Sequence, residues 1–269
     1  MIVIKLGGSV LEESMPDPFI EDLRGILTEH TMILVHGGRK IVNEVSRRMG
    51  KEPQFIVNPK GFRSRYTDKE TMDIFTMTMA GKINKALVSS LIKHGINAVG
   101  LSGIDGSLAL AERKRELIVQ DERGRRRIID GGYTGKINRI NTQLLRLLTE
   151  GGFVPVVSPI ALGDQFELLN VDGDRMAAYI AGAMKADSLL LLTDVEGLLL
   201  EGKPIPRLSR RELEAVQPKI GHGMITKIYA AQEALGMGVR EVIITSGKRE
   251  KAVSSALNHQ AGTLIVDEK

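Results

Sequence analysis

Short, continuous apolar runs alternate along the chain with longer segments whose apolar positions have helical spacing. Several runs are apolar at nearly every position, which is typical of parallel strands covered by helices on both faces. The predicted strands are Met1–Leu6, Met32–Val35, Ala98–Leu101, Val154–Ser158, Ser188–Thr193, Glu241–Thr245 and Gly262–Val266. The predicted helices are Pro18–Glu29, Lys40–Met49, Lys69–Lys93, Asn141–Glu150, Arg175–Lys185, Arg210–Ala215, Met224–Gly236 and Lys248–Asn258, with a capping box at Ser209 and Glu212. This alternation predicts an α/β fold, a three-layer sandwich with a mainly parallel sheet between helices.

Residues 107–130 depart from this alternation. Their apolar runs flank a candidate turn at Glu122–Arg125, which predicts an antiparallel β-hairpin inserted into the α/β core. A weakly marked boundary near residues 159–168 predicts two α/β lobes, an N-terminal lobe, 1–165, and a C-terminal lobe, 166–269.

Composition narrows the possible chemistry. The chain has 269 residues and no Cys, which excludes disulfides, thiolate nucleophiles and cysteine-based metal sites. No apolar run reaches the roughly 18–20 residues of a membrane span, and the first residues do not have the pattern of a signal peptide. We therefore expect a cytoplasmic protein without a membrane partner. The 37 Lys and Arg exceed the 33 Asp and Glu, a net charge of +4 that indicates an anionic partner.

Paired glycines follow two of the predicted strands. Gly7 and Gly8 come after the strand that carries Lys5, and Gly37 and Gly38 come after the next strand. Each pair alone is typical of an ordinary turn. Two such turns at the carboxyl edge of one parallel sheet favour a phosphate-binding site, because their N–H groups can face an anion. Further glycine turns at 131–132 and 221–223 could do the same, whereas the two common nucleotide-binding fingerprints are missing.

Carboxylates and a lysine complete the candidate chemistry. Asp172 and Asp174 open a predicted helix, where an N-cap is the simplest interpretation. Asp194 follows a very apolar strand, in a position that is also typical of a plain loop. Lys227 lies in the first turns of another helix, which is unfavourable for a cation and indicates an anionic ligand.

Five segments in order, KLGGS, HGG, NVDGD, LLTDVEGL and GMITK, resemble the amino acid kinase family over essentially the whole chain. The resemblance implies the amino acid kinase fold, with an open, mainly parallel sheet of about eight strands. It implies an N-terminal lobe that binds the phosphate acceptor and helps to form a homodimer, with residues 69–93 as the candidate dimer helix. The C-terminal lobe would bind ATP, with Mg²⁺ held by the nucleotide and no metal ligand from the protein.

The resemblance also implies roles for individual residues. Lys5 and Lys227 would stabilise the transferred phosphoryl group, Asp174 would orient both lysines, and Asp194 would support Lys227 or the nucleotide. The nucleotide and its phosphates would contact Gly7, Gly8 and Gly223. Because a carboxylate acceptor is already ionised at neutral pH, no general base is expected.

The acceptor would be held by Gly37, Gly38, Asn170 and an arginine. Arg63 is the first candidate for that arginine, and Arg65 competes because the segment Gly61–Thr67 is longer and more basic than in N-acetylglutamate kinases.

This longer segment and the inserted hairpin resemble a branch of the family that phosphorylates 2-aminoadipate or glutamate linked to a small acidic carrier protein, LysW, in lysine and arginine biosynthesis. Arg39 occupies a position where acetylglutamate kinases usually have a third glycine, which argues against an acetylated substrate. The alternative enzyme is an N-acetylglutamate kinase. A nucleic-acid-binding protein is disfavoured because the ordered glycines and carboxylates would have no role, and only four Tyr and six Phe are present.

The inserted hairpin is strongly basic. A solvated charged hairpin is one interpretation, and docking of the acidic carrier is the other. The candidate docking residues are Arg113, Lys114, Arg125, Arg126 and Arg127.

Overall fold

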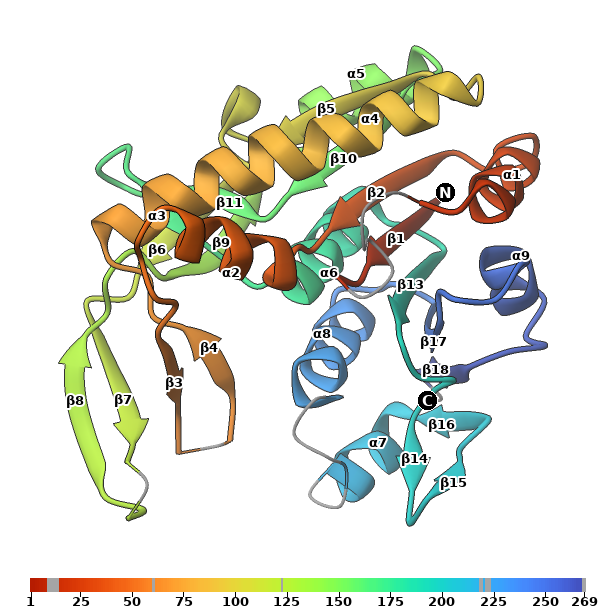
Figure 1. Cartoon of the computed structure of the whole chain (residues 1–269). Helices are drawn as coiled ribbons and strands as arrows, with labels where there is room; N and C mark the ends of the chain where they lie inside the picture. Colours follow the sequence, from red (N-terminus) through yellow and green to blue (C-terminus); the bar gives the residue numbers. More distant parts are fainter. Residues whose placement is uncertain (9–14, 60, 122, 218–219, 221–223, 268–269) are drawn as a thin grey trace.

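The computed structural model describes residues 1–8, 15–59, 61–121, 123–217, 220 and 224–267. An eight-stranded sheet runs through the whole molecule (Figure 1). All neighbouring strands are parallel except the β17–β18 pair, so the predicted α/β fold with a mainly parallel sheet is confirmed. In spatial order the strands are β16 (Arg207–Ser209), β18 (Thr263–Val266), β17 (Glu241–Ser246), β13 (Ser188–Thr193), β1 (Ile2–Leu6), β2 (Met32–His36), β10 (Val154–Ser158) and β5 (Ala98–Ser102).

Helices cover both faces of this sheet. One layer contains α1 (Asp17–Ile26), α2 (Arg39–Arg48), α3 (Lys69–Thr76), the π-helix η1 (Met77–Ile83), α4 (Asn84–Lys93) and α9 (Ala252–Leu257). The other contains α5 (Gln143–Glu150), α6 (Gly173–Met184), α7 (Arg210–Val216) and α8 (Ile225–Gly236). A short 3-10 turn, η2, spans Asp105–Ser107.

The alternation of β1 decides where its lysine points. Ile2, Ile4 and Leu6 pack in the core that includes α1, α4 and α9, whereas Val3 packs in the opposite core with α6 and α8. Because successive side chains of a strand point to opposite faces, Lys5 lies on the same face as Val3. The only charged position of this buried strand is therefore directed toward α6 and α8.

Four smaller sheets accompany the large one. A four-stranded sheet has the order β12 (Leu168–Asn170), β11 (Ile160–Leu162), β6 (Ala109–Arg113), β9 (Gly135–Ile140). The two-stranded sheets are β3 (Phe55–Val57) with β4 (Arg63–Arg65), β7 (Glu116–Gln120) with β8 (Arg126–Asp130), and β14 (Leu199–Leu200) with β15 (Lys203–Pro204).

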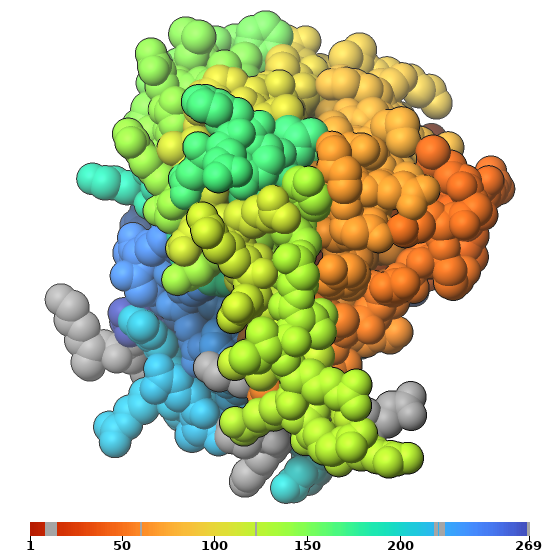
Figure 2. All heavy atoms as spheres, turned by 90° about the vertical axis from the view of Figure 1, so that its left-hand side faces the viewer, coloured from red at the N-terminus to blue at the C-terminus, as the bar shows by residue number. Residues whose placement is uncertain are grey.

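The predicted insertion is only partly a free hairpin. Strands β7 and β8 pair antiparallel, as expected, and extend from the body of the molecule as an arm beside the β3–β4 hairpin (Figures 1 and 2). Strand β6, which the prediction included in the hairpin, instead belongs to the four-stranded sheet, where it pairs with β9 and β11.

Most predicted boundaries are close to those observed. The predicted helix 69–93 is continuous, with a π-helical segment at 77–83 that its sequence did not indicate, and the capping box of Ser209 and Glu212 is present. Helix α9 begins at Ala252 rather than at Lys248. No helix within the described ranges is long and apolar enough to cross a membrane. The division into lobes 1–165 and 166–269 stays a prediction. Strand β1 of the first lobe pairs with β13 of the second, so the large sheet continues across the expected boundary.

Candidate active site

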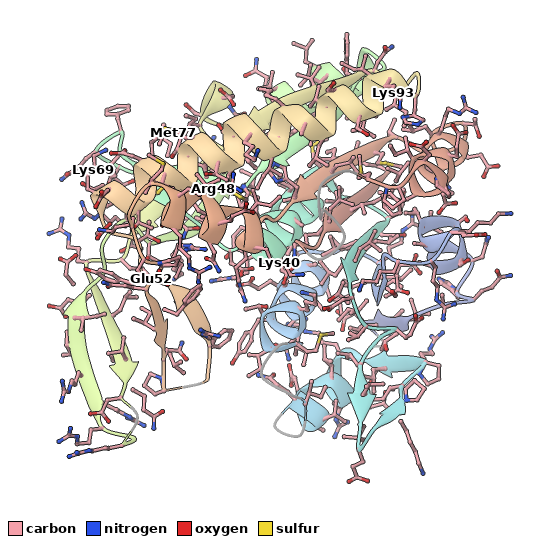
Figure 3. The ribbon with its side chains drawn as sticks, in the orientation of Figure 1. Lys40, Arg48, Glu52, Lys69, Met77 and Lys93 are labelled. Carbon is pink, nitrogen blue, oxygen red and sulfur yellow. The ribbon has the colours of Figure 1, made fainter. Side chains whose placement is uncertain are left out.

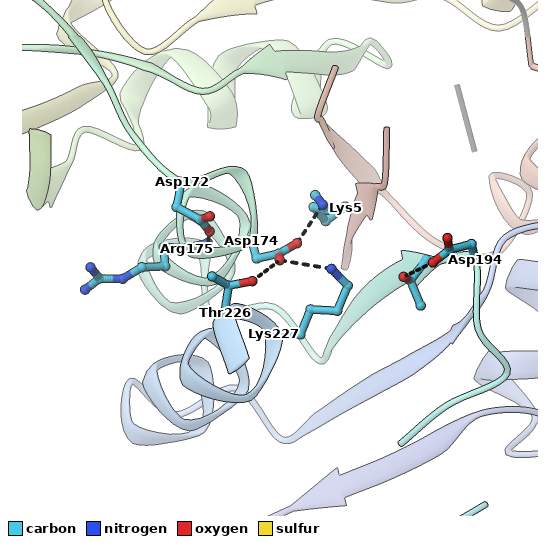
Figure 4. A network of polar contacts seen from close by, with 8 residues as sticks. Lys5, Asp172, Asp174, Arg175, Asp194, Thr226 and Lys227 are labelled. Carbon is cyan, nitrogen blue, oxygen red and sulfur yellow. Dashed lines mark hydrogen bonds and ion pairs between the residues drawn. The ribbon is translucent and has the colours of Figure 1, made fainter. Parts of the chain in front are cut away.

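A buried carboxylate joins two buried lysines (Figure 4). The Nζ atom of Lys5 lies 2.7 Å from Oδ1 of Asp174, and Nζ of Lys227 lies 3.1 Å from its Oδ2. Thr226 also donates its hydroxyl to Oδ2 at 3.3 Å. Three elements meet here, because Lys5 comes from β1, Asp174 from the first turn of α6 and Lys227 from the first turn of α8. The structure thus brings together the three residues that the sequence suggested as catalytic.

The charges of this cluster are only partly balanced. Lys5 and Lys227 are each 8% exposed and Asp174 is 4% exposed, so two ammonium groups share one carboxylate with little water. Burial lowers the pKa of Lys5, and the neighbouring Lys227 lowers it further, although Asp174 opposes both effects. Burial alone would raise the pKa of Asp174, but the two lysines hold that pKa well below its usual range. The cluster keeps a net positive charge that an anionic ligand would neutralise.

Glycines keep the space around this cluster narrow. A Cβ atom on Gly173 would lie 3.6 Å from Cε of Lys5, and one on Gly37 would lie 3.9 Å from the same atom. A Cβ on Gly7 would lie 2.7 Å from the carbonyl oxygen of Leu192, which is closer than real Cβ atoms come. Side chains at Gly173 and Gly37 would therefore come into contact with Lys5 and fill the space beside it, whereas one at Gly7 would force the loop away from β13.

Two of the four paired-glycine amides take part in the hydrogen bonding of the sheet. Gly7 donates its N–H to the oxygen of Leu192 at 3.1 Å, and Gly37 donates to the oxygen of Leu6 at 2.9 Å. The expectation that these two amides face a phosphate is therefore wrong, because they extend the strand pairing. Within the described part of the chain, the amides of Gly8 and Gly38 have no acceptor.

Gly8 keeps the second loop accessible. A Cβ atom at this position would lie 3.5 Å from the amide nitrogen of Gly38 and 3.4 Å from that of Arg39, which is the first residue of α2. The main chain of the first glycine loop therefore packs directly against that of the second. Because Gly8 has no side chain, the N–H groups of Gly38 and Arg39 at the start of α2 are not covered by this residue.

Arg65 and Arg63 differ sharply in their surroundings. Arg65 is 8% exposed and donates to Oδ1 of Asn43 at 2.5 Å, while its Nη1 has no acceptor within the described residues. Burial and the nearby Arg39 lower its pKa to about 10. Arg63 is exposed and lies over the ring of Phe55, at 4.6 Å. A buried, incompletely paired guanidinium is the better anion site, so the geometry favours Arg65 over the first candidate.

Asn170 lies beside the same segment. Its amide donates to Oγ1 of Thr67 at 2.9 Å, although 103 residues separate the two positions. Thr67 in turn accepts a main-chain hydrogen bond from Tyr133 at 2.7 Å. Asn170 and Arg65 are therefore linked through the short stretch 65–67, which places the two expected acceptor contacts near each other.

The remaining expected residues have mixed outcomes. Asp194 is exposed at the end of β13, accepts a hydrogen bond from Thr193 at 3.1 Å and forms no ion pair with Lys227 in the described structure (Figure 4). Of its two expected roles, support of Lys227 is thus not observed. Gly223 lies outside the described residues. Sequence patterns missed Arg175 of α6, whose bidentate ion pair with Glu233 ties α6 to the helix that carries Lys227.

The glycine turn at 131–132 has a structural role, which corrects the expectation of a phosphate contact. Gly131 donates its amide to the oxygen of Arg115 at 2.8 Å, and Gly132 donates to Oδ1 of Asp130 at 2.7 Å. A Cβ atom on either glycine would overlap a main-chain oxygen, that of Lys114 or that of Thr67. The turn lets the base of the hairpin pack against residues 65–67.

The basic residues of the insertion lie in two groups. At its base, Arg113 donates to the oxygen of Gly132 at 2.7 Å and covers the ring of Tyr133, while burial, Arg175 and Lys136 lower the pKa of the half-buried Lys114. At the tip, Asp121 pairs with Arg125 at 3.0 Å and with Arg127 at 3.5 Å. Arg126 points to the other face of the hairpin, and no ion pair of this residue occurs in the described structure.

Open amides and two lysines held by one carboxylate, at the carboxyl edge of a parallel sheet, are suited to a transferred phosphoryl group. Fold and site are those of a phosphotransferase. Residues 1–246 match the amino acid kinase family, and the chain belongs to that family. It is accordingly an amino acid kinase, and members of this class use ATP as the phosphoryl donor.

Similar chains extend over its full length. The LysW-aminoadipate/LysW-glutamate kinase of Metallosphaera sedula is 48% identical over 258 residues, which are 96% of this chain and 97% of the relative. The protein of that name from Saccharolobus islandicus is 46% identical over 268 residues, 99% of this chain and 100% of the relative. A protein of Cenarchaeum symbiosum, provisionally given the same name, is 54% identical over 267 residues, 99% of this chain and 100% of its own.

Solved structures of lower identity share the fold. An N-acetylglutamate synthase from Neisseria gonorrhoeae, complexed with coenzyme A and N-acetylglutamate, has a TM-score of 0.82 at 21% identity; the match covers 100% of this chain and 59% of that one. The smu.665 protein of Streptococcus mutans has a TM-score of 0.80 at 22% identity, with 99% and 98% of the two chains covered.

Proposed function

We propose that this amino acid kinase transfers the γ-phosphoryl group of ATP to the side-chain carboxylate of 2-aminoadipate or glutamate whose amino group is linked to the carrier protein LysW. The product would be an acyl phosphate for lysine or arginine biosynthesis. The full-length similarity to kinases named for these two substrates supports this choice. The observation that carries the chemistry is the buried Lys5–Asp174–Lys227 cluster.

The cluster is suited to the main difficulty of the reaction, which is to bring a carboxylate against a polyphosphate. Both reactants are anions, so the barrier is lowered by positive charge that is already in place. Lys5 and Lys227 supply this charge at low solvent exposure, and Asp174 holds their ammonium groups in position. The amides of Gly8 and Gly38 add donors beside them. The acceptor is already ionised at neutral pH, so no protein base has to remove a proton.

Mg²⁺ would accompany the nucleotide. No group of three His, Asp or Glu side chains that could hold a metal ion occurs in the described parts of the chain. Phosphate oxygens of the nucleotide would hold the ion, and the lysines would complete the neutralisation of the transferred group.

The acceptor would lie between the glycine loops and residues 65–67. Arg65 would pair with the carboxylate-type group of the acceptor that does not react, using the guanidinium nitrogen that has no partner within the described residues. Asn170 would contact the amide that joins the acceptor to its carrier. The alternative, free N-acetylglutamate, requires the same two contacts but gives the extended basic hairpin no role.

The β7–β8 arm would dock the acidic carrier. Its tip carries Arg125, Arg126 and Arg127, and Arg126 shares a face with the exposed, directly paired Ile118 and Ile128. Complementary charge would accelerate encounter, and exposed apolar side chains would stabilise the complex.

A homodimer would form through the long helix of the N-terminal half. Lys69 and Lys93 mark its two ends, and Met77 lies on its outer side (Figure 3). Met77 is 52% exposed and Ile92 is 55% exposed, so this helix has exposed apolar side chains. Light scattering after size-exclusion chromatography is the measurement; a monomeric mass at micromolar concentration would contradict a stable dimer.

The function is tested by ATP turnover with LysW-linked aminoadipate, LysW-linked glutamate and free N-acetylglutamate, with the acyl phosphate trapped by hydroxylamine. We expect hydroxamate formation with one or both carrier-linked substrates. Turnover of N-acetylglutamate alone would instead support the alternative.

Two sets of variants locate the activity. Lys227→Ala should lower kcat by about 10²- to 10³-fold, whereas Lys251→Ala, at an exposed position before α9, should leave kcat unchanged. Reversal of Arg125, Arg126 and Arg127 to Glu should raise KM for the carrier-linked substrate and not KM for ATP, and salt should have the same effect. If neither the charge reversal nor added salt changes the KM for the carrier-linked substrate, docking on the β7–β8 arm is excluded.

A further inference from the structure

Two buried polar side chains lie directly behind the second glycine loop. His36 is the last residue of β2 and is fully buried, and Asn84 is the first residue of α4 and is equally buried. The Nδ2 atom of Asn84 lies 2.8 Å from the oxygen of Val156, 3.2 Å from Nε2 of His36 and 3.4 Å from the oxygen of Leu101. On its other side, Nδ1 of His36 lies 3.0 Å from the oxygen of Gly37.

These contacts assign the imidazole tautomer. If the amide of Asn84 were reversed, its oxygen would face the carbonyl oxygens of Val156 and Leu101, so the nitrogen must occupy the Nδ2 position. An amide nitrogen is only a donor, and therefore Nε2 of His36 accepts. Nδ1 of the neutral ring then carries the proton and donates it to Gly37. Burial lowers the pKa of His36 to about 4, which keeps the ring neutral at physiological pH.

This hydrogen bond sets the direction of the next amide. The peptide bond between Gly37 and Gly38 is planar and trans, so its carbonyl and its N–H point in opposite directions. With the oxygen of Gly37 held by His36, the N–H of Gly38 is directed away from the histidine. Within the described residues this N–H has no acceptor, and Gly8 leaves the adjacent space open.

The segment before Asn84 fixes the same loop by contact. A Cβ atom on Gly38 would overlap Cδ1 of Ile83 and lie 2.9 Å from Sδ of Met79. Both residues belong to the π-helix η1, so one helical segment supports Gly38 by packing and, through Asn84 and His36, fixes the preceding carbonyl. π-Helical turns of this kind are frequent beside functional sites.

We propose that His36 is a positioning residue, whose tautomer Asn84 sets and whose Nδ1–H orients the Gly37–Gly38 peptide so that the N–H of Gly38 donates to the phosphoryl group in transfer. Neither side chain touches a substrate. This inference rests on the proposed function for the identity of the reacting group, while the orientation of the peptide rests on the contacts alone.

A matched pair of histidine variants separates the two ring nitrogens. The amide nitrogen of Asn can occupy the place of Nδ1, so His36→Asn keeps a donor for Gly37 and loses the contact with Asn84. The amide of Gln reaches the place of Nε2, so His36→Gln keeps the contact with Asn84 and loses the donor. We expect kcat within a few-fold of wild type for His36→Asn and at least about tenfold lower for His36→Gln, with KM for ATP unchanged in both.

Thermal unfolding of both variants is the control, because a purely structural histidine would make activity follow stability. Equal loss of kcat in the two variants, or the smaller loss in His36→Gln, would overturn the proposal. The KM for ATP is a second control, because a general disturbance of the site would change this KM together with kcat.

The tautomer is tested without any activity. Long-range ¹H–¹⁵N spectra of histidine-labelled wild-type protein should show a neutral ring with Nδ1 protonated, assigned by the signal that His36→Asn removes. If neither His36 variant folds, the signal of His36 can be identified instead as the one that shifts in Asn84→Ser. A ring protonated at Nε2 would overturn the proposal. If instead the wild type does not phosphorylate carrier-linked substrates but shows the Nδ1 tautomer, the proposed function fails and the orientation of the peptide stands.

Discussion

Replacement of Asp174 by Asn removes one charge from a buried cluster and little else. The amide has nearly the same volume as the carboxylate, and its oxygen can still accept the hydrogen bond from Thr226. What is lost is the charge between Lys5 and Lys227, whose ammonium groups lie 2.7 and 3.1 Å from the carboxylate oxygens. Two lysines, each 8% exposed, would then repel each other, with only the charge of Asp172, which is not ion-paired to them, acting against the repulsion.

The expected cost is large because removing one partner of a buried ion pair leaves an uncompensated charge, which typically destabilises by about 3–5 kcal/mol. For a chain of this size that corresponds to a fall in Tm on the order of 10 °C. The cost should shrink as pH rises. Asp174 raises the pKa of Lys5, so without it the folded variant loses this proton at a lower pH than wild type and is relieved of the repulsion.

Urea unfolding followed by far-ultraviolet circular dichroism at pH 6 and pH 9 measures both effects, and kcat should fall by about 10²-fold or more. Asp172→Asn is the matched control. Asp172, two residues away, caps α6 by accepting from the amide of Arg175, a role that Asn fulfils equally well. Its carboxylate forms no ion pair with Lys5 or Lys227 within the described residues and acts on them only through its charge, so its replacement should cost much less than that of Asp174. If Asp174→Asn were as stable and as active as Asp172→Asn, the two lysines would not depend on the carboxylate, and the assignment of the cluster would be refuted.

Three further predictions address neighbouring groups. Burial lowers the pKa of Lys5, so kcat should decline on the alkaline side before the ordinary lysine pKa of about 10.4; a pH profile flat up to that value would contradict an essential ammonium. Gly8→Ala should lower kcat about tenfold or more with little change in unfolding, because the added methyl would cover open amides. Gly25→Ala, in α1 with no heavy atom within 4 Å of the new methyl, should instead stabilise by about 0.5–1 kcal/mol and leave kcat unchanged. Arg65→Ala should raise KM for the acceptor by about 10- to 100-fold, as expected for a hydrogen bond to a charged group, and Arg63→Ala should not; the reverse order in steady-state kinetics would restore Arg63 as the acceptor ligand.

Sequence patterns located the strands of the large sheet well where burial on both faces makes them continuously apolar. They missed short strands such as β3, β4 and β16, which are three residues long and bury at most one residue each. Such strands depend on their partners more than on local preference; β16, for example, lies at the edge of the large sheet and pairs there with β18.

The candidate site shows the same division. Linear motifs were sufficient to predict Lys5, Asp174 and Lys227 as candidate catalytic residues, because these residues lie in motifs that follow one another in the order typical of the family. They could not distinguish Gly7 from Gly8, since which amide completes the strand ladder depends on the neighbouring β13. Nor could they distinguish Arg63 from Arg65, which lie on the same face of β4 and differ in how far along the hairpin burial extends, since Arg65 is buried and Arg63, nearer the turn, is exposed.

The sequence by itself determined the α/β class, the family and the chemical type of the reaction, because apolar periodicity and motif order are properties of the chain read in one dimension. Tertiary structure alone decided which donors remain open to a ligand, which arginine is buried and what lies behind the glycine loop. Those properties depend on hydrogen bonds between residues such as His36 and Asn84, or Asn170 and Thr67, that are 48 and 103 positions apart. Only the packing of the finished fold brings such pairs within hydrogen-bonding distance.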